Sequence, residues 1–166
     1  MNPGMQAKAV TASSADSPDQ GLVTFGLGDA LYAFQVESVL EVVSPLLVTA
    51  LFSLPDHVLG VMNLRGRVLP VSRLAALLGM RSPHREERVG LRVRCRDEEA
   101  VFAVDRVHSV LWISSARWEE VPGASRDRER AFFAGILPLE TPVTRIAVEK
   151  LFEPALWGAA SGATVS

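Results

Sequence analysis

The sequence predicts a mainly β protein built from two similar barrel-like units. Many short apolar segments alternate with turn signals at close spacing, a pattern typical of β-barrels. In addition, segment 34–42 aligns without gaps on segment 102–110, with Phe, Val, Val and Val at matching positions. This weak repeat indicates two units of similar structure.

Composition narrows the class of protein. A chain of 166 residues, 48% of them apolar, suits one domain or two small, closely packed units. A net charge of −2 gives no whole-chain reason to expect nucleic-acid or membrane binding. Cys95 is the one cysteine, which excludes an internal disulfide and fits a reducing cytoplasm. No apolar run approaches the ~20 residues of a membrane span, and the N-terminus has no secretory signal pattern.

Both ends of the chain contain few large apolar side chains that could be buried in a core. Residues 1–20 are rich in Ala, Ser, Asp, Pro and Gly, and we expect a disordered tail there. Residues 158–166 have a similar composition and are expected to be flexible. The folded domain is therefore expected over residues 21–157.

The first half of the chain predicts two hairpins. Segments 23–27 and 31–36 pair around the turn signal Gly28-Asp29, and 37–39 makes one helical turn. Segment 40–48 is a strand in which Pro45 marks a bulge or an edge, and 52–57 is a loop or short helical turn. Segments 61–64 and 68–71 form the second hairpin, and Gly66 supplies the positive φ of its turn.

The second half predicts further strands joined by polar segments. Ser72 caps a short helix with Leu74, Leu77 and Leu78 on one face, ending at Gly79, and 81–87 is a polar link. Strands follow at 91–95, 101–104 and 107–113. A polar loop over 114–130 precedes a strand pair at 131–139 and 143–148, and 150–157 forms a short helical cap.

No catalytic or metal-binding arrangement emerges from the sequence. His57, His84 and His108 lack metal-ligand spacing, and we expect surface or loop positions for them. Cys95 alternates with Leu91 and Val93 and is expected to be an inert core thiol. An enzyme is therefore not expected, and neither is a cofactor, a metal or a catalytic residue.

Three arginines on one strand raise a nucleic-acid alternative. Arg92, Arg94 and Arg96 share one face and could track phosphates. Acidic residues follow at 97–99, however, and no aromatic residues interleave on that face. We expect a solvated outer face, and a small nucleic-acid-binding β-barrel is the less favoured reading.

The second hairpin also carries a family pattern. Ser-Leu-Pro at 53–55, Val-Leu-Gly-Val-Met-Asn-Leu-Arg-Gly at 58–66 and Val-Leu-Pro-Val at 68–71 resemble the CheW family of chemotaxis coupling proteins. Phe-Gly-Leu-Gly at 25–28, Tyr-Ala at 32–33 and Val-Leu-Glu-Val at 39–42 match it too, so that the resemblance covers about 22–152. It implies two intertwined five-stranded SH3-like β-barrels with short helices.

The resemblance also implies a function. It implies a non-enzymatic cytoplasmic adaptor, without direct membrane insertion, recruited to membrane-associated receptor arrays. Its partners would be the regulatory domain of a CheA-type histidine kinase and the cytoplasmic tip of a chemoreceptor. Two departures, Arg73 where the family often has Asp and the segment 145–150 where it has an acidic helix start, bear on partner identity. An adaptor of a non-flagellar pathway, for surface motility or second-messenger control, is the alternative.

The partner-binding residues are carried over from the family signature. Glu41 and Arg65 are each a charge in an apolar strand, and each needs a partner of opposite charge or a carbonyl. In the family, the matching pair lies near the receptor-binding groove. The implied binding set is therefore Glu41, Asn63, Leu64, Arg65 and Gly66. A purely structural ion pair between Glu41 and Arg65 is the alternative, and both roles could hold together.

Overall fold

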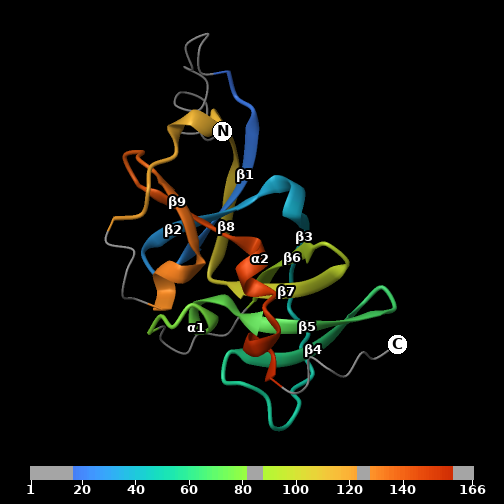
Figure 1. The fold of residues 1–166 in the computed structure, drawn as a ribbon. Helices are drawn as coiled ribbons and strands as arrows, with labels where there is room; N and C mark the ends of the chain where they lie inside the picture. Colours follow the sequence, from blue (N-terminus) through green and yellow to red (C-terminus); the bar gives the residue numbers. More distant parts are fainter. Residues whose placement is uncertain (1–16, 82–87, 123–127, 159–166) are drawn as a thin grey trace.

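The computed structural model describes residues 17–81, 88–122 and 128–158 (Figure 1). Within these residues the chain forms two five-stranded sheets and short helices. The mainly β fold with two five-stranded units is thereby confirmed. Most of the two predicted tails, His84 with most of the link 81–87, and part of the loop 114–130 lie outside the described residues.

Each sheet draws on both halves of the chain. The first sheet contains β1 (Gln20–Leu27), β2 (Ala30–Gln35), β8 (Arg106–Ile113), β9 (Phe133–Leu137) and β10 (Val143–Ile146), in the order β8-β1-β2-β10-β9. The second contains β3 (Val39–Val43), β4 (Val58–Leu64), β5 (Arg67–Arg73), β6 (Val89–Cys95) and β7 (Glu98–Val104), in the order β3-β6-β7-β5-β4. Helices α1 (Leu74–Leu77) and α2 (Val148–Leu151) follow β5 and β10.

The sequence repeat corresponds to a topological repeat. Replacing β1, β2, β3, β4 and β5 by β6, β7, β8, β9 and β10, and the reverse, converts the strand order of one sheet into that of the other. The parallel pair of β2 with β10 corresponds to the parallel pair of β7 with β5. Strands β3, β4 and β5 of the first half thus join β6 and β7, strands β8, β9 and β10 of the second half join β1 and β2, and the two units are intertwined as expected.

Single bridges close both sheets into barrels. In the second sheet the chain beyond β3 returns to β4, where Thr49 N donates to Val61 O at 2.7 Å and Val61 N donates to Thr49 O at 3.0 Å. In the first sheet Glu119 beyond β8 pairs with Ile136 of β9 at 2.8 and 2.9 Å. We call the first sheet barrel 1 and the second barrel 2.

The largest apolar core lies between the barrels. It joins β1 and β2 of barrel 1 to β6 and β7 of barrel 2, and α1 and α2 contribute to it. Phe34 of barrel 1 lies with its ring centroid 4.8 Å from that of Phe25 and 6.2 Å from that of Phe102 of barrel 2. Smaller clusters fill each barrel: Leu22, Ala33, Ile113, Leu137 and Val143 in barrel 1, and Val43, Met62, Leu69, Val71 and Val101 in barrel 2. The central strands therefore have two buried faces.

Several local predictions require correction. Strand β3 ends at Val43 rather than at residue 48. Ser72 does not cap α1, because its hydroxyl is fully buried and donates to His57 O at 3.1 Å. His57 lies in a loop as expected but is half-buried, with Nε2 2.7 Å from Leu156 O, which anchors the C-terminal segment. Burial lowers the pKa of His57, so that the neutral imidazole fits this position.

Segments predicted as strands near the C-terminus are shorter than expected. The segment 131–139 begins with a 3₁₀ turn, Arg128–Phe132, before β9, and β10 ends at Ile146. The predicted helical cap over 150–157 divides into α2 and a 3₁₀ turn at Pro154–Leu156. Arg96 has φ +56° and belongs to the turn between β6 and β7 rather than to the strand.

We expect Gly60→Ala to destabilise the fold strongly. Gly60 has φ +143°, and a Cβ there would lie 2.0 Å from Thr49 O, the atom that closes barrel 2. Because both the backbone conformation and the space exclude a side chain, we expect a loss of about 3 kcal/mol or more in unfolding free energy. Chemical denaturation would measure it.

Gly28→Ala is the matched control for that substitution. Gly28 has φ +58° but nothing within 4 Å of the added Cβ, so that only conformational strain of about 1 kcal/mol is expected. Equal destabilisation by the two variants would contradict the close approach of Thr49 to Gly60.

Candidate functional site

The turn between β4 and β5 presents the predicted signature residues. Arg65 has φ +51° and Gly66 has φ +83°, the geometry of a type I′ hairpin turn, and the positive φ expected of Gly66 is confirmed. Asn63 Oδ1 accepts a hydrogen bond from Gly66 N at 2.9 Å and braces the turn. Leu64 packs against the core of barrel 2. Asn63, Leu64 and Gly66 thus hold the turn, and Arg65 projects from it.

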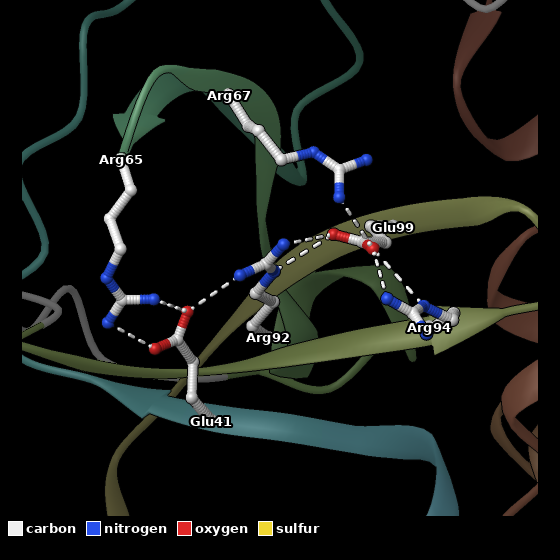
Figure 2. Close-up of polar contacts among 6 residues, drawn as sticks. All are labelled: Glu41, Arg65, Arg67, Arg92, Arg94 and Glu99. Atoms are coloured by element: carbon white, nitrogen blue, oxygen red, sulfur yellow. Dashed lines mark hydrogen bonds and ion pairs between the residues drawn. The ribbon is translucent and has the colours of Figure 1, made fainter.

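Arg65 reaches across the end of barrel 2 to Glu41 on β3. Its Nη1 donates to Glu41 Oε1 at 3.0 Å and its Nη2 donates to Glu41 Oε2 at 2.7 Å (Figure 2). Glu41 and Arg65, which the sequence predicts to lie close together, therefore form a bidentate ion pair. The Arg65 side chain is 72% exposed and that of Glu41 is 21% exposed, so that the arginine is the accessible member.

Glu41 has a second arginine partner. Arg92 Nη1 on β6 donates to Glu41 Oε1 at 2.9 Å, while Arg92 Nε and Nη2 donate to Glu99 Oε2 on β7 at 2.9 and 2.6 Å. Figure 2 shows Arg92 between the two carboxylates. Its side chain is only 12% exposed, against 4% for Glu99. Arg92 is therefore the centre of the network.

Two further arginines converge on Glu99. Arg94 Nε and Nη2 donate to Glu99 Oε1 at 3.2 and 2.9 Å, and Arg67 Nη1 on β5 donates to the same oxygen at 3.1 Å. We call the six residues the ionic network: Glu41, Arg65, Arg67, Arg92, Arg94 and Glu99. It joins β3, β6, β7 and β5 through their side chains.

The network lies at one mouth of barrel 2. Side chains two positions apart on a strand share a face. Glu41, Arg67 and Glu99 each stand two positions from a residue of the barrel-2 core, namely Val43, Leu69 and Val101. The network therefore lies over the end of that core. The expectation of a solvated outer arginine face is wrong for Arg92, since its side chain is only 12% exposed and is held by Glu41 and Glu99.

The arginines lower the pKa of both carboxyl groups. Hydrogen bonds from Arg65 and then Arg92 lower the pKa of Glu41. Burial raises the pKa of Glu99, but hydrogen bonds from Arg92 and Arg94 outweigh it, and the net pKa is lowered. Hydrogen bonds to Glu41, and for Arg92 also to Glu99, raise the pKa of Arg65 and Arg92. All these groups are charged at neutral pH.

Barrel 1 carries a neutral counterpart at the equivalent positions. The repeat aligns Glu41 with Ser109. In barrel 2 the cross-strand neighbour of Glu41 is Arg92, and in barrel 1 the cross-strand neighbour of Ser109 is Thr24. Thr24 Oγ1 is bonded to Ser109 O at 2.9 Å and lies 3.3 Å from Ser109 Oγ. Thus an ion pair in one barrel is replaced by a pair of hydroxyls in the other.

Apolar side chains are exposed beside both of these positions. On β3, Leu40 and Val42 flank Glu41 in the sequence and are exposed. On β8, Val110 and Trp112 are 49% and 54% exposed. Large exposed apolar groups beside polar ones are typical of protein-binding surfaces. A further exposed group lies in the loop after β3: Leu47, Leu51 and Phe52.

Arg145 is the first residue of the segment 145–150, which departs from the family pattern, and its side chain has defined contacts. Its guanidinium lies 4.6 Å from the centroid of the Trp118 ring, and Nη2 donates to Ala134 O at 3.2 Å. Burial lowers its pKa. Arg145 therefore packs within barrel 1 rather than extending a charged helix start.

Sequence reasoning missed four members of the network. Arg67, Arg92, Arg94 and Glu99 were not assigned to the site. One signal was present, since a two-residue turn at 96–97 sets Arg94 opposite Glu99 across β6 and β7.

No group of three or more His, Cys, Asp or Glu suited to a metal occurs among the described residues, and no helix within them could span a membrane.

Comparisons with known proteins agree on one family. Residues 21–155 match the model of the CheW-like domain. A probable chemotaxis protein CheW of Rhizobium etli is 34% identical over 84% of this chain and 91% of its own length. The chemotaxis protein CheW of Helicobacter pylori is 28% identical over 89% and 92%. The crystal structure of the scaffolding protein TtCheW from Thermoanaerobacter tengcongensis superposes with a TM-score of 0.74 and 28% identity, over 82% of this chain and 93% of that one.

We expect Glu99→Gln to change how stability depends on pH. Because the pKa of Glu99 is lowered in the folded protein, its ionised form stabilises the fold above the ordinary value of 4.5, and this stabilisation is lost as pH falls below it. At pH 7 the Glu99→Gln variant should melt several degrees below the wild-type protein. On acidification to pH 3 its melting temperature should fall less than that of the wild-type protein. Glu98→Gln, on the same strand, should behave like the wild-type protein. Indistinguishable acid profiles for all three proteins would contradict the assigned role of Glu99.

Proposed function

The chain belongs to the CheW-like domain family and is a non-enzymatic chemotaxis scaffolding protein, and on that premise we propose that it links two specific partners. One is the cytoplasmic tip of a chemoreceptor, and the other is the regulatory domain of a CheA-type histidine kinase. The adaptor would hold kinase and receptor in fixed geometry at membrane-associated receptor arrays, so that receptor conformation biases kinase activity.

The observation that carries this proposal is the difference between the two barrels. A scaffold must bind two unlike partners at once, and it therefore needs two unlike surfaces on one rigid body. Equivalent positions carry Glu41 and Arg92 in barrel 2 but Ser109 and Thr24 in barrel 1. The shared core between the barrels fixes these two surfaces relative to each other.

We assign the receptor to the surface around the β4–β5 turn. The binding set would be Glu41, Asn63, Leu64, Arg65 and Gly66, in which Arg65 is the accessible charge and the others hold it in position. The kinase domain would use a separate surface, for which Val110 and Trp112 on β8 are the apolar candidates.

The first test is co-purification of the full chain from its native cell with identification of the bound proteins. Recovery of both a histidine kinase and a chemoreceptor is expected. Recovery of neither would contradict the proposal. The fragments identified in this way would then be used for binding measurements.

We expect Arg65→Lys to weaken receptor binding more than kinase binding. Lysine keeps the positive charge but cannot form the bidentate hydrogen bonds of a guanidinium with a carboxylate. Arg67→Lys is the matched control, because Arg67 makes one contact to Glu99 and none to Glu41. Calorimetric titration with each partner fragment would measure the affinities. An equal loss of both affinities, or an equal effect of both variants, would contradict the assignment.

A further inference from the structure

The ionic network carries more positive than negative charge. Among the described residues, four guanidinium groups, those of Arg65, Arg67, Arg92 and Arg94, surround the carboxylates of Glu41 and Glu99. This mouth of barrel 2 is therefore cationic, although the chain as a whole has a net charge of −2. A surface of this kind favours a partner that brings negative charge.

The arginines differ in how freely they can move. Arg92 is nearly buried and holds both carboxylates, so that it is fixed in place. Arg65 is 72% exposed, projects from a turn and, among the described residues, contacts the carboxylate of Glu41 alone. Its side chain is the most exposed of the four arginines, against 57% for Arg67 and 49% for Arg94, so that its guanidinium is the one that an incoming group reaches most freely.

Arg92 determines what happens to Glu41 when Arg65 leaves. If Arg65 were the only partner of Glu41, its departure would leave a partly buried carboxylate without a cation, which is unfavourable. Because Arg92 Nη1 stays 2.9 Å from Glu41 Oε1, that carboxylate keeps a charged partner. Arg65 can therefore exchange Glu41 for another carboxylate.

We infer that the mouth of barrel 2 recognises a carboxylate side chain of the protein partner, by exchange of Arg65 from Glu41 to the incoming Asp or Glu. The guanidinium fork matches a carboxylate with two parallel hydrogen bonds. Arg92 is a positioning residue in this exchange, since it compensates Glu41 and does not touch the partner. The inference rests on the proposed function, in which a receptor segment docks on this surface.

The test measures binding of the full chain to the receptor cytoplasmic fragment identified by co-purification, at low and at high salt. Wild-type affinity should fall as salt rises, because charge attraction is screened. In the Arg92→Met variant, Arg65 is the remaining cation beside Glu41 and therefore stays bound to it. The affinity for the receptor fragment at low salt should then fall by about fivefold or more, and this affinity should depend little on salt. Arg92→Lys, which keeps a cation near Glu41, should recover part of the loss.

Arg94→Met is the matched control. It removes the same charge from the same strand, but Arg94 contacts Glu99 and not Glu41. It should reduce receptor affinity much less than Arg92→Met. Melting temperatures of all variants would establish that the fold is retained, and binding of the kinase fragment should be unchanged.

The outcomes separate the inference from the proposed function. Failure of the wild-type chain to bind the receptor fragment at all would overturn the proposed function. Binding that is insensitive to salt, or equal weakening by Arg92→Met and Arg94→Met, would overturn the exchange of Arg65 and leave the adaptor role standing.

Discussion

Strand β3 leaves the sheet of β1 and β2 to pair with β6, and strand β8 leaves the sheet of β6 and β7 to pair with β1. Neither half of the chain can therefore complete a barrel alone. The largest core lies between the barrels, where Phe34 faces Phe102, so that separating them would expose more apolar surface than opening either one. For a scaffold, this exchange would keep the two proposed docking surfaces at a fixed distance and angle.

Within this frame the two barrels differ in charge at equivalent positions. At equivalent positions, Thr24 and Ser109 form a neutral hydroxyl contact in barrel 1, while Arg92 and Glu41 are charged in barrel 2. Exposed ion pairs add little to stability, and buried ones are costly to desolvate. Because the pKa of Glu99 is lowered in the folded protein, the closed part of the network, around Arg92 and Glu99, contributes to stability, whereas the open part at Arg65 is the part that the proposed function uses.

The sequence was sufficient for the parts that depend on local chemistry. The turn at Gly66 followed from its apolar flanks, the two units followed from the repeat of 34–42 in 102–110, and the pairing of Glu41 with Arg65 followed from the family signature. The repeat alone did not predict the exchange of strands, because a repeat does not say which strands pair; the intertwined arrangement was implied only by the family resemblance. The setting of Arg92 was misjudged for a related reason. Alternation shows that β6 has two unlike faces, but both are covered here, one by the other barrel and one by the network.

The central claim is that one rigid body presents two separate surfaces of different chemistry. Hydrogen exchange of the full chain tests it most directly, with the receptor fragment and the kinase fragment added separately and then together. The account predicts slower amide exchange at β3 and the β4–β5 turn with the receptor fragment, at β8 with the kinase fragment, and at both with the two together. Protection of the same strands by both fragments, or displacement of one fragment by the other, would contradict it.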